Sequence, residues 1–376
     1  MSRSLSVLNH PPLSLRMPNV YPIAVTPTLS EHLKSGAVVG IGVSGGKDSL
    51  AMAYALMEYL DRISHSGPRV LIHSDLGLIE WRESLPMCEL LAQRLGLELI
   101  VVHKDMIARW KQRQQNTVRR YERLECVKLV MPWSSAQWKF CAGEQKLEPI
   151  SSALTHRFPF QVILSASGIR RDESNERKKA AVSKEQPKLL RKKLGTSGYD
   201  WHPIIEWSLQ DVFAYHQEKR IPLHAAYQMG STRVSCTYCV LSSRNNLAVA
   251  TLCEANHKAY RELVSIEIAS TFSFQLGSWL GDVAPHILDQ EMREALADAK
   301  RRAHRREQAE SRLPKHLLYQ KGRPIAVPTW DEARLLSEVR KAVAEAVRVD
   351  IDYTTPAAIR DRYSELLNLH VQRAAS

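Results

Sequence analysis

One stretch near the start of the chain, Val38 to Leu60, combines three local patterns that together constrain the fold strongly. It reads VVGIGVSGGKDSLAMAYALMEYL. The apolar run from Val38 to Val43 is typical of a buried strand, and the apolar residues from Leu50 to Leu60 recur at the spacing of an amphipathic helix. The polar residues between them, Ser44 to Ser49, predict a sharp turn from the strand into the helix.

This turn is typical of a phosphate-binding site. Gly45 and Gly46 permit positive φ angles and close backbone approach, so amide groups at the start of the helix can point at phosphate oxygens. Lys47 adds a movable positive charge. Asp48 and Ser49 are candidates either for capping the helix or for holding Mg²⁺.

Two commoner phosphate-binding motifs do not fit the same residues. The Walker motif needs a glycine where this chain has Ile41 and a serine or threonine where it has Asp48. The glycines between residues 40 and 45 do spell G-x-G-x-x-G, but the first two lie inside the predicted strand. The next acid at a strand end, Asp75, comes about ten residues later than a dinucleotide-binding fingerprint requires.

The chain continues with strands that alternate with helices. The sequence predicts strands at Arg69 to His73, Leu97 to His103 and Val162 to Ser165, and a helix at Glu80 to Leu95. Alternation at this spacing indicates a parallel sheet, which binds its ligands beyond the carboxyl ends of the strands. Asp75 follows the second strand, where it is a candidate either for contacting a ribose or Mg²⁺ or for capping the next helix.

The strand that ends at Ser165 is followed by SGIRRDESNER, residues 167 to 177. This pattern places a glycine turn and several guanidinium groups at the edge of the sheet that carries the phosphate loop. Guanidinium groups can hold phosphate bidentately, and Glu173 is able to orient them. The candidate binding residues of this segment are Gly168, Arg170, Arg171, Glu173, Ser174 and Arg177.

The hexapeptide Ser44 to Ser49 after a strand resembles the pyrophosphate loop of the ATP pyrophosphatase (PP-loop) superfamily. That superfamily includes tRNA sulfurtransferases, phosphoadenylyl sulfate (PAPS) reductases and DNA phosphorothioation proteins. The segments 167 to 177 and 201 to 241 resemble the PAPS reductase-like family in particular, so the resemblance covers roughly residues 36 to 245.

The resemblance implies an α/β fold of the adenine nucleotide alpha hydrolase-like type, with a parallel sheet and a helical C-terminal domain. It implies that ATP and Mg²⁺ bind at residues 44 to 49, at Asp75 and at the candidates of the 167 to 177 segment. The residues implied in catalysis are Lys47, Asp48, Arg170 and Arg171.

The cysteines suggest a metal site. Cys236 and Cys239 form a C-x-x-C pair, a spacing that lets two thiolates reach one metal. In the iron–sulfur members of the superfamily, a cysteine ahead of a Lys-x-x-Pro segment joins this pair, and Cys141, with Lys146 and Pro149 behind it, occupies that place. The resemblance therefore implies a [4Fe–4S] cluster on Cys141, Cys236 and Cys239, with a structural zinc ion or a redox dithiol as alternatives.

The chain departs from the family pattern in two ways. Adenylyl sulfate reductases have paired cysteines where this chain has Phe140 and Cys141, so a fourth ligand is left open, with Cys126 and Cys253 as candidates. Sulfate reductases of the superfamily also need a nucleophilic cysteine near the carboxyl terminus, and no cysteine follows Cys253. This counts against reduction of a sulfonucleotide by this chain alone.

The remaining sequence predicts an extended arm over residues 1–29, a nucleotide-binding domain over 30–245 and a helical domain over 246–376. Ser30 is predicted to cap a short helix before the first strand. Three segments add to the formal net charge of +12. They are a polar helix within residues 105–128, a mobile basic loop at 178–193, and the run Lys300 to Arg306, which we interpret as a surface that follows a phosphate backbone rather than as a solvated helix face.

These features predict an enzyme that adenylates an acceptor with release of pyrophosphate and then exchanges AMP for sulfur at the cysteine site. The acceptor is expected to be a nucleic acid, either DNA or tRNA, and the sulfur donor a protein such as a cysteine desulfurase. No apolar run reaches the length of a membrane span, so we expect no membrane partner and a cytoplasmic location. Two alternatives are a sulfonucleotide enzyme related to PAPS reductase and a regulator that senses nucleotides or binds DNA without turnover.

Overall fold

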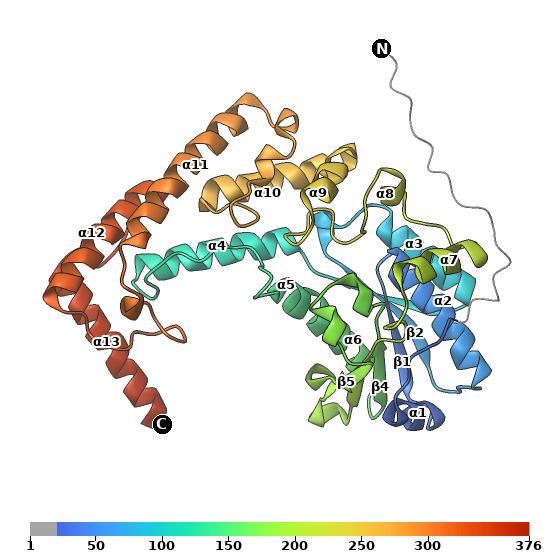
Figure 1. Cartoon of the computed structure of the whole chain (residues 1–376). Helices are drawn as coiled ribbons and strands as arrows, with labels where there is room; N and C mark the ends of the chain where they lie inside the picture. Colours follow the sequence, from blue (N-terminus) through green and yellow to red (C-terminus); the bar gives the residue numbers. More distant parts are fainter. Residues whose placement is uncertain (1–20, 376) are drawn as a thin grey trace, which may run out of the picture.

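The computed structural model describes residues 21–375, in which six strands form one sheet of order β3-β2-β1-β4-β6-β5 (Figure 1). The strands are β1 (Val38–Val43), β2 (Arg69–Asp75), β3 (Glu98–His103), β4 (Val162–Ala166), β5 (Ser183–Glu185) and β6 (Ser197–Trp201). Neighbouring strands pair in parallel, except that β5 runs antiparallel to β6. The predicted α/β class with a parallel sheet is thereby confirmed.

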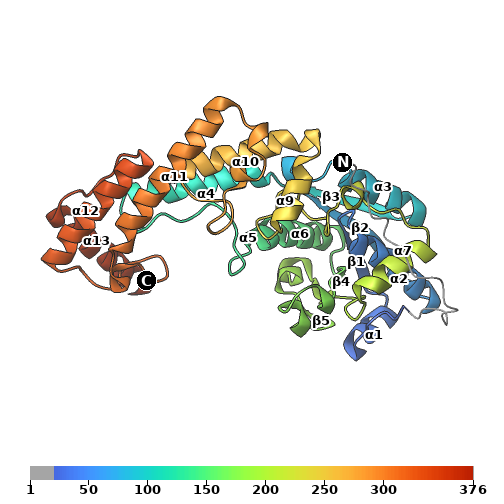
Figure 2. The ribbon, with the colours of Figure 1, turned by 45° about the horizontal axis from the view of Figure 1, so that its top comes forward.

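The helices of the described residues cover both faces of the sheet and then continue into a separate helical region (Figures 1 and 2). They are α1 (Pro27–Lys34), α2 (Lys47–Arg62), α3 (Ser84–Leu95), α4 (Met106–Glu122), α5 (Phe140–Ala142), α6 (Glu148–Arg157), α7 (Leu209–Glu218), α8 (Ala225–Gln228), α9 (Arg244–Thr251), α10 (His257–Ser270), α11 (Gln290–Ser311), α12 (Trp330–Val347) and α13 (Pro356–Ala375). None of them combines the length and the apolar character that a membrane span requires.

Two apolar cores hold the sheet between its helices. On one face, residues of α1, α2, α3 and α7 pack with Ile41, Leu71 and Leu164. On the other face, Leu154 of α6 packs with Val38, a strand residue that is fully buried. Burial on both faces explains why β1 is a continuous apolar run instead of an alternating one.

The segment before the sheet differs from the prediction. Helix α1 begins at Pro27 and is capped by Thr26, whose hydroxyl accepts a hydrogen bond from the amide of Leu29, so the predicted cap at Ser30 is wrong. Residues 21–25 lie against the sheet domain. The indole N–H of Trp201 donates to the carbonyl of Ala24 at 2.7 Å, and the indole N–H of Trp207 donates to the carbonyl of Pro22 at 2.9 Å. Most of the predicted arm, residues 1–20, lies outside the described residues.

Helix α4 connects the sheet to the helical region. Its first turns pack in one core with residues of α10, through Met106, Ile107 and Trp110. Its last turn, with Tyr121, joins a core formed chiefly by α12 and α13. Residues 106–129 therefore pack largely with helices that follow residue 245.

The basic segment predicted as a mobile loop, residues 178–193, is partly built into the sheet. It contains β5, which pairs with β6, and two short helical turns. Two of its basic residues form ion pairs with Glu148 of α6: Lys188 binds one carboxylate oxygen and Arg191 binds the other. The sequence analysis missed β5 and β6 because three- and five-residue strands carry little periodic signal.

Candidate nucleotide and cysteine site

The phosphate loop lies at the carboxyl end of β1, where the central strands of the sheet open into a crevice. Gly45 has φ +71° and Gly46 is the N-cap residue of α2, which has no side-chain cap among the described residues. The hydroxyl of Ser49 braces the loop: it accepts from the amide of Ser44 at 3.2 Å and donates to the carbonyl of Gly46 at 2.9 Å. The loop is thus braced from within. No described side chain caps Gly46, although the amide of Lys47 in the first turn donates to the hydroxyl of Tyr227 at 3.4 Å.

Lys47, Asp48 and Arg170 form one charged cluster beside this loop. Asp48 accepts from the ammonium of Lys47 at 2.8 Å through one oxygen and from Nε of Arg170 at 2.7 Å through the other. Lys47 and Arg170 are 4% and 3% exposed. The carboxylate of Asp48 thus holds both cations at the N-terminus of α2, although Arg170 lies far from this loop in the sequence.

Gly168 brings the second predicted segment into contact with the first. A Cβ atom at this residue would lie 2.8 Å from the backbone carbon and oxygen of Asp48. Backbone atoms at that distance cannot give way as a flexible side chain can. Only glycine therefore lets the loop after β4 approach the first turn of α2 closely enough to bring Arg170 to Asp48.

These elements surround a cavity of about 560 Å³. It is lined by residues 42–44 and 46–49, by Ser74, by residues 167–170, 172 and 173, and by Thr232 to Val234, among others. Of the described residues, the charged ones that line it are the cations Lys47, Lys146, Arg170, Arg177 and Arg233 and the carboxylates Asp48, Asp172 and Glu173. With five cations and three carboxylates, the lining carries an excess of positive charge. Burial, together with the positive charge of Arg233, lowers the pKa of Arg177.

Lys146 reaches the cavity from an irregular part of a helix. The residues Gly143–Leu147 form a π-helical turn between α5 and α6. Pro149 has no N–H with which to bind the carbonyl of Gln145, and the hydroxyl of Ser74 donates to that carbonyl instead, at 3.2 Å. A π turn of this kind is frequent at functional sites. The sequence indicated this lysine only as part of the cysteine pattern, and its place in the cavity follows from the turn.

Three predicted binding or catalytic residues do not line the cavity. Arg171 donates to the carbonyl of Ala180 at 3.0 Å and pairs with Glu206. The carboxylate of Asp75 accepts from the amide of Gly77 at 2.8 Å and lies 3.0 Å from Nδ1 of His103. Ser174 is exposed and accepts from the amide of Arg177 at 3.2 Å. Their predicted roles stay predictions without support from this geometry.

Three charged lining residues were not among the predicted site residues: Lys146, Asp172 and Arg233. Arg233 stands three residues before the C-x-x-C pair, and its distance in sequence from the phosphate loop hides its place. Tyr227 was likewise missed; its hydroxyl lies 3.4 Å from the amide nitrogen of Lys47, and its ring lies 5.6 Å from the ammonium of that lysine. Tyr227 and Arg233 join the site because the segment after α7 packs against the loop that follows β1.

The three predicted metal ligands lie on the side of the cavity that Lys146 faces. Burial, opposed by the ammonium of Lys146 and aided by the charges of Glu80, Cys239 and Cys141, raises the pKa of the Cys236 thiol to about 12. The Cys236 thiol donates to Glu80 at 3.8 Å. Among residues 21–375, no three His, Cys, Asp or Glu side chains form a group that could hold a metal ion, so the cysteine site stays a prediction.

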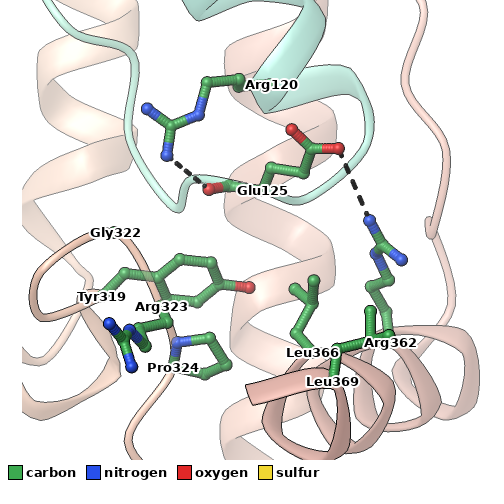
Figure 3. A pocket seen from close by; sticks show the side chains of 9 residues that line it. All are labelled: Arg120, Glu125, Tyr319, Gly322, Arg323, Pro324, Arg362, Leu366 and Leu369. Atoms are coloured by element: carbon green, nitrogen blue, oxygen red, sulfur yellow. Dashed lines mark hydrogen bonds and ion pairs between the residues drawn. The ribbon is translucent and has the colours of Figure 1, made fainter. Parts of the chain in front are cut away.

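A second cavity, of about 590 Å³, lies in the helical region between the end of α4, the loop around Gly322 and α13 (Figure 3). It is also rich in arginine, but Figure 3 shows two of these side chains directed at one residue, Glu125. Arg120 donates to the Glu125 carbonyl at 3.0 Å, and Arg362 lies 3.7 Å from its carboxylate. Arg362 is also bound to Glu365.

The run Lys300 to Arg306, interpreted from the sequence as a phosphate-following surface, is buried at two of its arginines, whereas Arg301 and Arg305 are exposed. Arg302 and Arg306 are 5% and 2% exposed. Arg302 donates to Asp298 at 2.9 Å and to the carbonyl of Ile268 at 3.0 Å, and Arg306 binds Glu310 and a backbone carbonyl of the α10 end. The run therefore fastens α11 to α10, and that interpretation of it was wrong for these two residues.

Comparison with known proteins gives three similarities. A 37.8 kDa uncharacterized protein of Escherichia phage 186 is 24% identical over 242 residues, which are 55% of this chain and 68% of the phage protein. The PAPS reductase of Candida auris in a phosphate complex is 15% identical, over 57% of this chain and 97% of that one, with a TM-score of 0.32. The U34-tRNA thiolase NcsA of Methanococcus maripaludis with its [4Fe–4S] cluster is 20% identical, over 64% and 74% of the chains, with a TM-score of 0.35.

The sequence profile of one family matches more than half of the chain. It is the phosphoadenosine phosphosulfate reductase domain, and the match runs over residues 39–242. This range contains the phosphate loop, the Gly168 segment and the C-x-x-C pair, so the family match and the cavity involve the same residues. The chain belongs to the phosphoadenosine phosphosulfate reductase domain family.

Proposed function

We propose that this protein is an ATP-dependent sulfurtransferase that adenylates an acceptor and releases pyrophosphate. One observation supports this most: an uncapped helix N-terminus, five cationic side chains and three carboxylates converge on one cavity of about 560 Å³ among the described residues. Backbone amides at a helix N-terminus together with arginine and lysine are suited to a polyphosphate. Family membership adds that the chemistry of the fold is linked to nucleotides and sulfur.

The β- and γ-phosphates of ATP would bind at residues 44–49, with Lys47 and Arg170 turning from Asp48 toward the phosphate oxygens. Because Asp48 already holds both cations in place, little side-chain ordering is needed when the nucleotide binds. Asp48 and Asp172 provide the carboxylate oxygens that Mg²⁺ prefers, and the ion would neutralise phosphate charge there.

In the first step an oxygen of the acceptor attacks the α-phosphorus of ATP. A new P–O bond forms, the bond between the α-phosphorus and the bridging oxygen breaks, and pyrophosphate leaves with the electron pair. The amides of the loop, Lys47 and the guanidinium groups of Arg170 and Arg177 stabilise the charge that develops on the leaving group.

In the second step sulfide attacks the activated atom of the acceptor. The sulfide derives from the persulfide of a protein such as a cysteine desulfurase, whose S–S bond is cleaved with two electrons from a thiol reductant. The bond to sulfur forms and AMP leaves with the former acceptor oxygen. Cys141, Cys236 and Cys239 would hold an iron–sulfur cluster that binds and presents sulfide. Their thiols interact electrostatically, and Lys146 connects their surroundings to the cavity wall.

A binding experiment tests the first half. Isothermal titration with ATP and with pyrophosphate is expected to give about 100-fold weaker binding for Lys47→Met, because a buried charge-assisted bond to phosphate is lost. Lys34→Met, an exposed lysine of α1, is the matched control and is expected to bind as the wild type does. Equal affinities for the two variants would contradict the proposed loop site.

Turnover is tested by pyrophosphate release from ATP in the presence of tRNA or DNA. Release that depends on one acceptor supports adenylation. If neither acceptor stimulates release while a 3′-phosphorylated adenylyl sulfate binds in the same cavity with higher affinity than ATP, the sulfonucleotide alternative replaces this proposal.

Metal analysis tests the second half. Anaerobically purified protein is expected to be brown and to contain iron and acid-labile sulfide, and Cys236→Ser is expected to lose both. Cys253→Ser tests the fourth ligand, because Cys253 packs against the same core as Cys141 and Cys236. Cys126→Ser is the control and is expected to keep its iron, because Cys126 packs with Tyr121 in the core of the helical region, so the prediction of Cys126 as a candidate ligand was wrong. A colourless protein with one equivalent of zinc would remove the sulfur-transfer step.

A further inference from the structure

A short turn between α4 and α5 presents an exposed tryptophan. The ring of Trp138 is 49% exposed. The turn that carries it is closed by two hydrogen bonds, from the amide of Trp138 to the hydroxyl of Ser135 at 3.1 Å and from the amide of Ser135 to the carbonyl of Trp138 at 3.2 Å. Figure 2 shows that the segment joining α4 to α5 projects between the sheet domain and the helical region.

The exposed ring is held in place from one side. The guanidinium carbon of Arg113 lies 4.2 Å from the ring centroid of Trp138 and 3.9 Å from that of Phe140. Phe140 is buried, so the arginine fixes the tryptophan to the core of the domain. A large apolar ring that is exposed yet fixed costs little conformational entropy when a ligand stacks on it.

The turn is next to the cavity. Lys139 pairs with Glu176, which directly precedes Arg177 of the cavity wall. On the other side, the helical segment that starts at Phe140 leads through the π turn to Lys146 of the cavity wall. The turn that carries Trp138 is therefore connected to the cavity wall at two points, through Glu176 to Arg177 and through the π turn to Lys146.

The charges near the turn select the class of ligand. Arg113 and Lys139 are cations that flank the ring, and the end of α4 adds Arg119 and Arg123, which are exposed. A cationic surface with one exposed aromatic ring is the arrangement with which proteins bind single-stranded nucleic acid, because phosphates meet the cations and a base stacks on the ring. A protein partner would favour a wider apolar patch with fewer charges.

We infer that Trp138 is a stacking platform for a base of a single-stranded nucleic acid acceptor, adjacent to the reaction cavity. The inference rests on the proposed function, since it names the class of acceptor for that reaction. The base next to the modified position would stack on the tryptophan, and the backbone phosphates would contact Lys139 and the exposed arginines at the end of α4.

The chain offers a matched control. Trp330 is 55% exposed and also carries an arginine over its ring, with the guanidinium carbon of Arg360 at 4.6 Å from the centroid, but it lies at the start of α12. Fluorescence anisotropy of labelled single-stranded DNA and RNA oligonucleotides would be measured with the full chain. Trp138→Ala is expected to weaken binding about tenfold, Trp138→Phe to keep it within about threefold, and Trp330→Ala to leave it unchanged.

Two further readouts separate stacking from other roles. The slope of log affinity against log salt concentration is expected to stay the same in Trp138→Ala, because no charge is removed, and to become shallower in Lys139→Met. ATP affinity is expected to be the same in Trp138→Ala as in the wild type. A failure of the proposed function would appear as absent ATP binding by the wild-type protein, independently of the oligonucleotide result.

Equal oligonucleotide affinities for Trp138→Ala and Trp330→Ala would overturn the inference. It would also be overturned if Trp138→Ala bound oligonucleotides normally but lost sulfur transfer from a desulfurase, because the ring would then contact the donor protein.

Discussion

The two arginine-rich cavities have almost the same volume, about 560 Å³ and 590 Å³, but they use their cations differently. In the crevice of the sheet domain, one carboxylate, Asp48, holds two cations beside an uncapped helix N-terminus. In the helical region, Arg362 is engaged by Glu125, by Glu365 and by the carbonyl of Arg123. Arg170 and Arg177 of the crevice also pair with carboxylates, Asp172 and Glu173, so a count of cations says little about binding. What distinguishes the crevice is the helix N-terminus beside these cations.

Other arginines of the helical region are engaged by the protein in the same way as Arg362. Arg340 is 1% exposed and donates to the carbonyls of Tyr121, Glu122 and Asp352. Together with Arg302 and Arg306, it uses a guanidinium group to join helices that lie far apart in the sequence. Charge in this region thus contributes to stability, whereas we propose that charge in the crevice binds a ligand.

The largest expected effect comes from removing the buried cation of the crevice. Arg170→Ala leaves Asp48 with one partner fewer and the carbonyl of Trp207 without its donor, and should cost about 4 kcal/mol of stability in urea unfolding, with loss of ATP binding. Arg362→Ala, whose partner Glu125 is 39% exposed, should cost only about 1 kcal/mol and leave ATP binding intact. Similar losses of ATP binding in both variants would remove the distinction between the cavities.

A pH effect is expected from the helical region. Glu267 is fully buried, and this burial raises its pKa from 4.5 to about 7, although the amides of Phe274, Leu280 and Gly281 bind its carboxyl group. Between these two values the folded protein binds a proton that the unfolded chain does not. The stability contributed by the neutral form is therefore present below pH 4.5 and falls by about 3 kcal/mol as the pH rises to 7.

Unfolding of the wild type and of Glu267→Gln at several pH values would measure this contribution. The variant should lose most of the dependence between pH 5 and 7 and keep its affinity for ATP. A variant with the wild-type pH profile would assign the dependence to other groups.

A steric prediction sharpens the description of the crevice. Gly168→Ala should destabilise the protein by about 2 kcal/mol and weaken ATP binding, because the new Cβ would meet backbone atoms of Asp48 at 2.8 Å. Gly143→Ala is the control, since a Cβ there meets no described atom within 4 Å. Thermal unfolding and ATP titration would be measured together, and normal ATP binding by Gly168→Ala would mean that the two loops need not touch.

The smallest effect is expected in the second cavity. Arg120→Ala removes an exposed side chain that donates to the carbonyl of Glu125, so stability should change by less than about 0.5 kcal/mol and ATP affinity should not change. A clear drop in ATP affinity, measured by titration, would show that the two cavities communicate.

Much of the fold could be predicted because its signals are local. The strand of β1, the turn at residues 44–49 and helix α2 follow one another without a gap, and the structure places them with the predicted strand bounds. The helices α10 to α13 lie within residues 246–376, which were predicted to be helical. Helix α3 begins at Ser84, four residues after the predicted start, because a short helical turn at Gly77–Ile79 precedes it.

The site could be predicted only in part. Neighbouring residues of the phosphate loop stay together in any fold, and Gly168 and Arg170 arrive at the loop because parallel strands end at one edge. Arg171 and Asp75 share that edge, but their side chains are engaged by Glu206 and by His103. Side-chain direction depends on neighbours from other elements, which no local pattern contains.

By itself, the sequence determined the α/β class, the phosphate loop and the family, because these depend on short contiguous motifs and on strand and helix periodicity. The tertiary structure alone decided which cations face the crevice. Lys146 and Arg233 join it, whereas Arg302, Arg306 and Arg340 are buried as links between helices. The physical reason is that a charge is available to a ligand only when the fold leaves it without sufficient partners, and that is a property of the packed chain.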